Sequence, residues 1–245
     1  MNKKVVLITG STGLGESIIK KYAENNYDIV MTYLNHENEA KKLENQIKVK
    51  YDINTLCIKC DLSKEEDIIS LKDKVLEKFK TIDILINNAS IAMDTTFDNK
   101  TKENFMKILE VNLVGTFLIS KYFGDIMYEN KVGNIVNISS TNGIDTYYEY
   151  GLDYDSSKAA VINLSHNLAN HYSPYIRVNT VCPGWIDTPM NKDMDENFKK
   201  DEENKILLKR FANPNEIANV IYFITSEDAS YINDSVIRID GGKKC

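Results

Sequence analysis

Short runs of apolar and β-branched residues recur along the chain, separated by longer stretches whose polar positions follow a helical spacing. Several of these runs are almost continuously hydrophobic, which is typical of strands buried on both faces of a parallel sheet. Parallel strands need crossover connections, usually helices, so the alternation predicts an α/β fold with a seven-stranded parallel sheet, doubly wound with helices on both faces. The expected strands are Lys4–Thr9, Asp28–Tyr33, Asn54–Cys60, Ile82–Asn87, Gly133–Ser139, Arg177–Cys182 and Ser235–Ile239.

Two of the intervening stretches carry helix-start signals. Ser63 is followed three residues later by Glu66, which is the spacing of a capping box. The apolar residues that follow lie on one face of the expected helix: Ile68, Leu71, Val75 and Phe79. Asn213 and Pro214 combine a cap residue with a proline at the first helical position, so a second helix is expected to begin there.

The composition is that of an ordinary globular protein, with 42% hydrophobic and 27% charged residues. We interpret residues 1–245 as a single domain, because no repeat or linker interrupts them. The net charge is -6 and the lysines are scattered, so neither nucleic acid nor an anionic membrane is expected as a partner. The sequence has neither a signal-peptide pattern nor a long apolar segment, and a cytoplasmic location is expected.

The cysteines and histidines do not favour a metal site. Cys57 and Cys60 form a CxxC pattern, but their odd separation along an expected strand places the two sulfurs on opposite faces. A redox or metal pair is therefore the less favoured interpretation. Cys182 and Cys245 are isolated, and the three histidines, His36, His166 and His171, lack ligand spacing.

A glycine-rich loop, Gly10–Gly15, joins the first expected strand to a helical stretch at Glu16–Tyr22. Glycines permit a tight turn and a close approach of the backbone, and the free N–H groups at a helix N-terminus attract a pyrophosphate. A plain turn is the simpler alternative. The strand before the loop and the helix after it favour a Rossmann-type dinucleotide-binding unit.

The end of the second expected strand lacks the acidic residue that would bind the ribose of NAD and repel the 2′-phosphate of NADP. Tyr33, Leu34, Asn35 and His36 stand there, and the first acid is Glu37. NADP(H) is therefore favoured over NAD(H). Asn35 and His36 are candidate phosphate contacts, although solvated loop positions are the alternative for both.

A series of motifs, spread in order along the whole chain, resembles the short-chain dehydrogenase/reductase family. The motifs are TGSTGLG at residues 9–15, CDLS at 60–63, NNAS at 87–90, VNLVGTF at 111–117, VNISS at 136–140, YDSSK at 154–158, VCPGWIDTPM at 181–190 and YINDSVIRIDGG at 231–242. The chain departs from the family pattern in three places. The glycine loop is one residue short, Thr12 stands where a basic residue is frequent in NADP-using members, and Ser90 replaces a glycine.

The resemblance implies a nicotinamide-dependent oxidoreductase whose catalytic residues are Asn112, Ser140, Tyr154 and Lys158. In this scheme Ser140 binds the substrate carbonyl, Tyr154 transfers the proton, Lys158 also holds the nicotinamide ribose, and Asn112 helps to hold a water molecule. With the loop and second-strand positions included, the expected cofactor contacts are Gly10, Ser11, Thr12, Gly13, Leu14, Asn35, His36, Asp61, Leu62, Asn88, Ala89, Ser90, Pro183, Gly184, Ile186 and Thr188, together with Tyr154 and Lys158.

Helical spacing selects one phenol from the tyrosine-rich stretch that precedes Lys158. Only Tyr154 lies four residues from that lysine, on the same helical face, whereas Tyr147, Tyr148 and Tyr150 lie further back. A nearby ammonium stabilises a phenolate, so we expect the pKa of Tyr154 to lie below its ordinary value near 10. A Tyr–Lys pair at this spacing also occurs by chance on surface helices.

Strand alternation and the family motif both favour Ser140 over Ser139, which remains the alternative. Fourteen positions separate Ser140 from Tyr154, so the intervening loop is expected to carry an insertion.

Similar sequences in this family include 3-oxoacyl-[acyl-carrier-protein] reductases, which need a basic docking patch for an acidic carrier. Little positive charge is visible here, and Asp145, Glu149 and Asp153 precede Tyr154. A small carbonyl or secondary alcohol is therefore the favoured substrate, with the carrier-protein reductase as the alternative. A non-catalytic NAD(P)-binding redox sensor is an alternative of another class.

The polar segment 186–210 is expected to form a mobile substrate lid. The family resemblance also implies a homotetramer, built with the helices that begin near Glu103 and Tyr154 and with the last strand. Apolar residues of these helices belong either to that interface or to the core: Phe117, Leu118, Val161, Leu164 and Leu168.

Overall fold

The computed structural model describes residues 3–191 and 194–242. These form a seven-stranded parallel sheet with the strand order β3-β2-β1-β4-β5-β6-β7. The strands are β1 (Val5–Ile8), β2 (Asp28–Tyr33), β3 (Thr55–Lys59), β4 (Ile84–Asn87), β5 (Gly133–Ile138), β6 (Ile176–Pro183) and β7 (Val236–Ile239). The fold class, the number of strands and their places along the chain are thereby confirmed.

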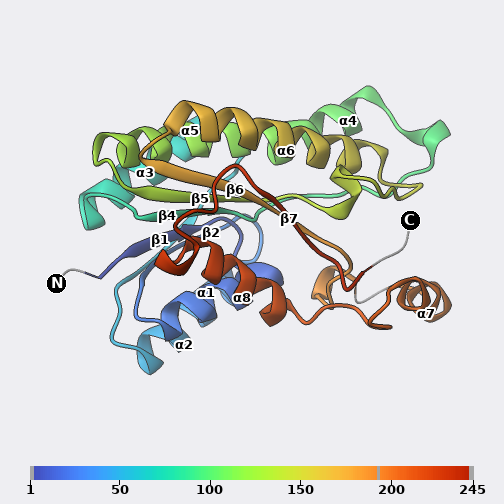
Figure 1. Cartoon of the computed structure of the whole chain (residues 1–245), viewed down its shortest axis with the longest axis horizontal. Coiled ribbons are helices and arrows are strands. Elements are labelled where there is room, and N and C mark those ends of the chain that lie inside the picture. Colours follow the sequence, from blue (N-terminus) through green and yellow to red (C-terminus); the bar gives the residue numbers. More distant parts are fainter. Residues whose placement is uncertain (1–2, 192–193, 243–245) are drawn as a thin grey trace.

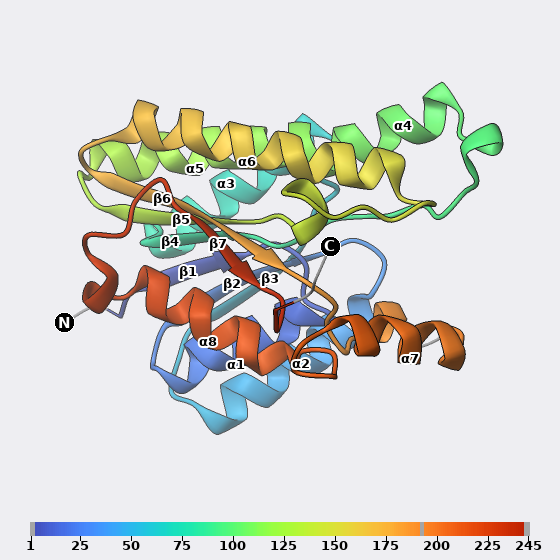
Figure 2. The same cartoon turned by 45° about the vertical axis from the view of Figure 1, so that its right-hand side comes forward.

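Helices cover both faces of this sheet (Figure 1). One face carries α1 (Leu14–Glu24), α2 (Glu37–Lys50) and α8 (Pro214–Thr225), and the other carries α3 (Glu65–Phe79), α5 (Thr116–Glu129) and α6 (Leu152–Tyr172). The shorter α4 (Lys102–Leu109) precedes α5, and α7 (Glu196–Lys205) lies beyond the carboxyl ends of the strands (Figure 2). Short helical turns are η1 (Phe97–Asn99), η2 (Glu110–Gly115), η3 (Thr141–Gly143), η4 (Pro189–Asn191) and η5 (Glu227–Ala229).

Strand alternation divides the core into two layers. Val6 and Ile8 of β1 pack into the layer under α1, α2 and α8, whereas Val5 and Leu7 pack into the opposite layer. Cys57 belongs to the first layer and Cys60 to the second, so the predicted separation of the two sulfurs is confirmed. The described residues include no cluster of His, Cys, Asp or Glu that could hold a metal ion. Cys245 lies outside the described residues.

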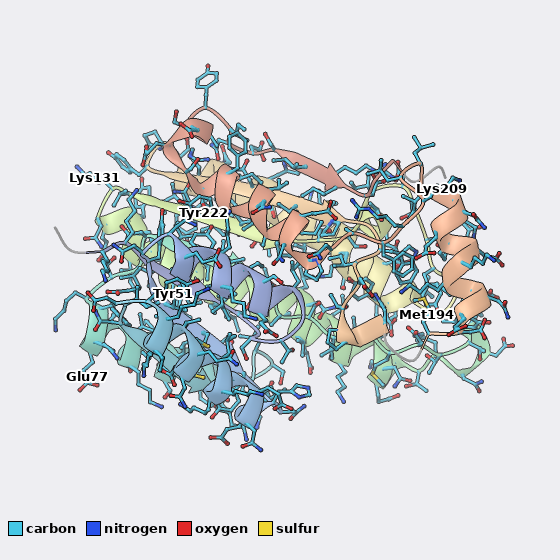
Figure 3. The ribbon with its side chains drawn as sticks, turned by 90° about the horizontal axis from the view of Figure 1, so that it is seen from below. Tyr51, Glu77, Lys131, Met194, Lys209 and Tyr222 are labelled. Carbon is cyan, nitrogen blue, oxygen red and sulfur yellow. The ribbon has the colours of Figure 1, made fainter. Side chains whose placement is uncertain are left out.

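Aromatic rings join α1 to α8. Tyr22 of α1 is fully buried, its ring lies 5.4 Å from that of Tyr222, and its hydroxyl is 2.6 Å from the Thr225 hydroxyl. Tyr222 is labelled on α8 in Figure 3, which looks at this face of the sheet. Burial raises the pKa of Tyr22 far above its usual range, so this phenol is a neutral packing element.

The two predicted helix starts turn out differently. At α8 the Asn213 side chain accepts the Asn215 N–H at 2.9 Å and Glu216 closes the capping box, which confirms that start. The capping box at Ser63 is wrong: α3 begins at Glu65, and the Ser63 hydroxyl donates to the Asp61 carboxylate at 2.7 Å instead. The carboxylate is the stronger local acceptor and draws the serine into the turn before the helix.

Several residues considered for a subunit interface belong to the interior. Val161 and Leu168 are buried, and Leu118 and Leu164 pack against the same core layer. Phe117 is different, because 41% of it is exposed. None of the described helices is long and apolar enough to cross a membrane.

Candidate active site

The carboxyl ends of four adjacent strands bring the sequence-predicted residues together. Gly10 follows β1, Asn88 follows β4, Ser140 follows β5 and Gly184 follows β6. In an open parallel sheet the crevice at the carboxyl ends of the strands, near the point where the strand order reverses, is the place where ligands bind. Here that point lies between β1 and β4.

The glycine loop is held in a shape that only glycine accepts at three positions. Gly10 and Gly13 have φ values of 77° and 59°, and a Cβ on Gly15 would lie 1.9 Å from the Gly10 carbonyl oxygen. Asn88 fixes the loop from the neighbouring strand, because its Nδ2 donates to the Thr9 carbonyl at 2.9 Å. The Thr9 hydroxyl in turn accepts the N–H groups of Asn88 and Ala89.

One buried polar group in this loop suits an anionic ligand. The Ser11 side chain is 4% exposed, and its hydroxyl has no hydrogen-bond partner among the described residues. It lies just before the N-terminus of α1, where free N–H groups and the helix dipole favour a phosphate. The residues present therefore fit a pyrophosphate, although the loop is one residue shorter than the family pattern.

The segment after β2 is largely open to solvent. Asn35 and His36 are exposed in the turn before α2, with the His36 Nδ1 4.0 Å from a Glu39 carboxylate oxygen. Tyr33 is buried, and this burial together with the nearby Glu37 carboxylate raises the pKa of the Tyr33 phenol. The nearest acid to the strand end thus lies beside a tyrosine.

Asp61 and Leu62 shape the edge of the crevice after β3. The Asp61 carboxylate accepts the N–H and the hydroxyl of Ser63, and its own N–H donates to Asp67 at 2.9 Å. Leu62 is buried, and its backbone comes so close to Gly115 that a Cβ there would lie 2.6 Å from the Leu62 oxygen.

Ser140, Tyr154 and Lys158 come together at the end of β5. The Ser140 hydroxyl lies close enough to the Tyr154 phenol to lower the pKa of that phenol. The Lys158 Nζ lies 5.4 Å from the centre of the Tyr154 ring and donates to the Ile138 carbonyl at 2.8 Å. Ser139 instead donates to the Lys158 carbonyl at 2.7 Å, which leaves Ser140 as the serine that faces the phenol.

The pKa values at this site are governed by burial. Burial raises the pKa of Tyr154 to about 12, with a further rise from the Asp155 charge and a smaller fall from the Ser140 hydroxyl. Burial also lowers the pKa of Lys158 to about 8. The expectation that Lys158 holds the phenol pKa below 10 is therefore wrong for the protein alone, because removing a phenolate from water costs more than the neighbouring ammonium restores.

Asn112 lies in η2, a π-helical turn between α4 and α5 that the sequence pattern did not predict. Its side chain accepts the Ile91 N–H at 2.9 Å and donates to the Ile91 carbonyl and to the Ser157 hydroxyl. Asn112 thereby fastens the loop after β4 to the helix that carries Tyr154. Single π-helical turns are frequent at functional sites because they redirect one side chain out of the helical repeat.

The turn after β6 closes the crevice from the other side. Ile186 forms an isolated bridge with Ala212, and Thr188 lies against the glycine loop, 3.7 Å from where a Gly13 Cβ would stand. The Gly184 N–H donates to the Ile239 carbonyl at 3.0 Å. The expected lid, residues 186–210, begins within this turn, and residues 192–193 of it lie outside the described residues.

An aromatic cluster beside the crevice was missed by the sequence analysis. Trp185 stacks on Phe211 at 5.4 Å, and its ring lies 6.2 Å from those of Tyr148 and Phe198. The Trp185 Nε1 also donates to the Glu202 carboxylate of α7 at 2.7 Å. These residues come from separate segments, so only the fold assembles them.

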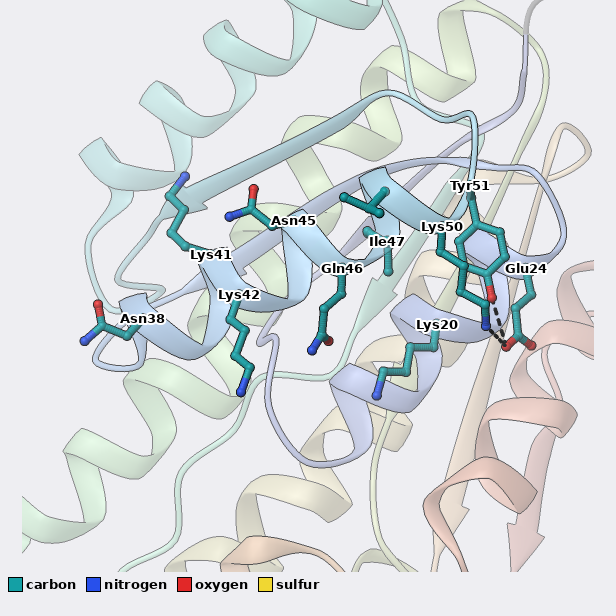
Figure 4. A pocket seen from close by; sticks show the side chains of 11 residues that line it. Lys20, Glu24, Asn38, Lys41, Lys42, Asn45, Gln46, Ile47, Lys50 and Tyr51 are labelled. Carbon is teal, nitrogen blue, oxygen red and sulfur yellow. Dashed lines mark hydrogen bonds and ion pairs between the residues drawn. The ribbon is translucent and has the colours of Figure 1, made fainter.

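A separate groove of about 880 Å³ lies between α1 and α2 (Figure 4). Within it the Tyr51 hydroxyl donates to the Glu24 carboxylate at 3.2 Å, and the Lys50 ammonium lies 3.9 Å from the same group. None of the residues that line this groove is a predicted site residue. The catalytic interpretation therefore belongs to the crevice at the strand ends.

Comparisons with known proteins agree with this placement. A family model described as enoyl-(acyl carrier protein) reductase matches residues 8–244. The chain is 36% identical to the 3-oxoacyl-[acyl-carrier-protein] reductase of Aquifex aeolicus, covering 98% of this chain and 96% of that protein. It is 32% identical to an acetoacetyl-CoA reductase of Acinetobacter, covering 98% and 97%. Among solved structures it is similar to acetoin dehydrogenase from Salmonella typhimurium, with a TM-score of 0.89, 27% identity and coverage of 99% and 96%.

Proposed function

Because the chain belongs to the short-chain dehydrogenase/reductase family, we propose that it transfers a hydride between a nicotinamide cofactor and a ketone or secondary alcohol. It is an NAD(P)(H)-dependent oxidoreductase, and Tyr154 serves as its general acid and base. The observation that carries this assignment is the grouping of Ser140, Tyr154 and Lys158 at the end of β5, where the Lys158 ammonium lies 5.4 Å from the centre of the Tyr154 ring.

When bound, the nicotinamide cofactor supplies or accepts the hydride. The glycine loop from Gly10 to Leu14 would hold its pyrophosphate, with Ser11 as an added donor. Ser140 would bind the substrate oxygen, and Tyr154 would donate a proton to that oxygen during reduction. Lys158 would place positive charge next to the phenol and hold the nicotinamide ribose, while Asn112 would keep the loop after β4 in place and help to hold a water molecule.

The raised pKa of Tyr154 suits the reductive direction. A phenol with a pKa of about 12 stays protonated at neutral pH and is ready to donate. The positive charge of an oxidised nicotinamide would stabilise the phenolate and bring the pKa back toward neutrality for the reverse reaction. The positive charge of the oxidised cofactor, added to that of Lys158, would thus favour proton transfer from the substrate hydroxyl to Tyr154 instead of from Tyr154 to the substrate oxygen.

We favour NADP(H) over NAD(H). Support comes from the strand end at Tyr33, where the buried ring replaces the carboxylate that would repel a 2′-phosphate, and from the exposed positions of Asn35 and His36. Thr12 provides no positive charge for the 2′-phosphate. This feature favours NAD(H) instead.

The favoured substrate is a small carbonyl compound or secondary alcohol. The aromatic cluster of Tyr148, Trp185 and Phe198 joins the loop before Tyr154 to the proposed lid, residues 186–210. The loop before Tyr154 carries Asp145 and Glu149, and both are exposed. The similarity to the Aquifex protein supports 3-oxoacyl-[acyl-carrier-protein] reductase as the second candidate.

We further propose that residues 1–245 form one domain, that the protein is cytoplasmic and that it assembles as a homotetramer, as the family resemblance suggests. The exposed Phe117 of α5 is the apolar residue that best supports such an interface.

The assignment is tested by Tyr154→Phe, assayed with acetoacetyl-CoA, diacetyl and a panel of other ketones, with NADPH and with NADH. We expect the rate to fall about 10²–10⁴-fold, because a phenyl ring cannot donate the proton. Cofactor binding, followed by the fluorescence of the reduced nicotinamide, should persist.

The control is Tyr147→Phe, which makes the same chemical change at a residue that is 86% exposed in the same loop. Its turnover should match that of the unaltered protein. Retained turnover in Tyr154→Phe would overturn the assignment. Cofactor binding without turnover on any substrate by the unaltered protein would favour the redox-sensor alternative.

A further inference from the structure

Two carboxylates flank Tyr154 in the sequence, and each is bonded to a different loop. Asp153 is fully buried and pairs with Lys100 at 3.0 Å, and the same ammonium also donates to the Met93 carbonyl. Asp155 is turned toward the loop between Ser140 and Tyr154. The helix that carries the proposed acid is therefore tied on both sides to the loops at the crevice.

Asp155 organises its loop through two hydrogen bonds. One carboxylate oxygen accepts the Asn142 Nδ2 at 2.7 Å, and the other accepts the Tyr148 N–H at 2.9 Å. Gly151 lets the chain fold back, because its N–H donates to the Tyr148 carbonyl at 2.8 Å. The inserted loop thus wraps around one carboxylate.

The first bond reaches the proposed catalytic pair. The Asn142 backbone N–H donates to the Ser140 hydroxyl oxygen at 3.2 Å. This bond occupies a lone pair of the Ser140 oxygen and leaves the hydroxyl hydrogen available for Tyr154, the phenol whose pKa Ser140 lowers. Asp155 therefore acts on Ser140 through one intermediate residue.

The second bond reaches the aromatic cluster and α7. The Tyr148 ring lies 6.2 Å from the rings of both Trp185 and Phe198, and the nearby Asp94 carboxylate raises the pKa of its phenol after the larger effect of burial. Phe198 belongs to α7, within the expected lid. Holding the backbone of Tyr148 in place consequently fixes where α7 meets the crevice.

We propose that Asp155 is a positioning residue for the reaction: it aims the Ser140 hydroxyl at Tyr154 and sets the Tyr148 ring against α7. The inference deepens the proposed function and rests on the roles given there to Ser140 and Tyr154. On this inference the inserted loop between Ser140 and Tyr154 has a role. Its turn, bound to the Asp155 carboxylate, joins Ser140, beside the proposed catalytic acid Tyr154, to the expected lid.

The charge of Asp155 also acts on the phenol directly. It raises the pKa of Tyr154, after the larger effect of burial, and Cys182 raises it slightly as well. Asp153 and Asp94 face Asp155 and raise the pKa of its carboxyl, as burial does more strongly, while the bonds from Asn142 and Tyr148 lower it. The Lys158 ammonium lies 5.4 Å from the centre of the phenol ring.

The test compares Asp155→Asn and Asn142→Ala with the exposed, charge-matched control Glu149→Gln. Trp185 is the only tryptophan of the chain, so its emission reports the cluster without any substrate. We expect Asp155→Asn to shift that emission to longer wavelength and to lower kcat for diacetyl or acetoacetyl-CoA about 10- to 100-fold, with KM for NADPH within about twofold.

The pH profile separates positioning from a merely structural effect. Reduction slows as pH rises through the pKa of Tyr154, because the phenol must be protonated. Asp155→Asn removes a negative charge next to the phenol, so this decline should move to lower pH. Asn142→Ala keeps that charge and should lower kcat without moving the decline.

Unchanged emission and kcat in Asp155→Asn would overturn the inference, as would an effect of equal size in Glu149→Gln. If Asp155→Asn does not fold, Asn142→Ala still tests the link between Asp155 and Ser140. An unchanged kcat in Asn142→Ala would contradict that link. The proposed function fails separately, when Tyr154→Phe retains turnover. In that case the emission of Trp185 still tests whether Asp155 places Tyr148.

Discussion

Burial acts on Tyr154 and Lys158 in the same sense, since it disfavours the charged form of each side chain. The consequence is opposite in pKa: it rises to about 12 for the phenol and falls to about 8 for the ammonium. Lys158 is 3% exposed, and its Nζ has the Ile138 carbonyl as acceptor. A buried ammonium at neutral pH lowers the stability of the fold. The proposed function nevertheless requires this ammonium at the site.

Replacing this lysine with an apolar residue should therefore stabilise the protein while abolishing turnover. We expect Lys158→Met to raise the free energy of unfolding at pH 7 by about 1–3 kcal/mol, measured by urea denaturation. The unfolded chain keeps the lysine proton up to about 10.5, whereas the folded protein releases it near 8. The unfolded state thus binds more protons between these values, and the stability of the unaltered protein rises with pH across that window.

The advantage of Lys158→Met should accordingly shrink between pH 8 and 10.5, the two values that bound the lysine's titration. Arg would keep the charge, so Lys158→Arg is the control and should not gain stability. A variant Lys158→Met that is less stable than the unaltered protein at pH 7 would contradict this account.

At the scale of elements, the ends of helices decide which local signals matter. Asn213 caps α8 with its own side chain, and Glu216 completes the box while pairing with Arg210 at 2.7 Å. Ser63 has the same kind of sequence signal but donates to Asp61, and α3 begins without a side-chain cap. Two similar helix-start signals, at Ser63 and at Asn213, are therefore expected to contribute differently to the free energy of unfolding.

Truncating each of these two residues should expose the difference. Asn213→Ala is expected to lower the free energy of unfolding by about 1 kcal/mol, because it leaves N–H groups at the start of α8 without their acceptor. Ser63→Ala should change it by less than about 0.5 kcal/mol. Urea denaturation of both variants measures the contrast, and equal losses would show that the sequence signal rather than the geometry decides.

At the scale of the whole molecule, η2 and α5 carry an apolar surface that lies outside the two core layers. Val114 of η2 and Phe117 of α5 are 45% and 41% exposed, within one turn of each other along the chain. Neighbouring exposed apolar side chains on a helix mark surfaces that associate with another chain. This surface is where we expect a second copy of the protein to pack.

A homotetramer would give a light-scattering mass near four times 28.0 kDa. Phe117→Arg places a charge in the proposed interface and should reduce that mass to a dimer or monomer value. Val49→Arg alters an apolar residue of α2 that is 90% exposed and should leave the mass unchanged. A monomer mass for the unaltered protein, or no effect of Phe117→Arg, would count against this interface.

The sequence alone was sufficient for the sheet, because strands buried on both faces are marked by continuous apolar runs, and local composition reports burial directly. It also selected Tyr154, since the spacing of four residues to Lys158 is a property of any helix. Even the separation of Cys57 from Cys60 followed from strand alternation. These features depend only on residues close together along the chain.

Only the tertiary structure decided the properties of a residue that depend on its complete surroundings. Burial, which comes from the whole fold, raised the pKa of Tyr154 against the expectation from its neighbour Lys158. The cap at Ser63 was lost to a local competitor instead, because the Asp61 carboxylate two residues earlier accepts the Ser63 hydroxyl. Asp155 acquired its partners from the loop that precedes its helix, and Trp185 acquired ring contacts from Tyr148, Phe198 and Phe211. Desolvation and competition among hydrogen-bond acceptors are set by the complete three-dimensional surroundings of a group, and no local pattern of residues contains them.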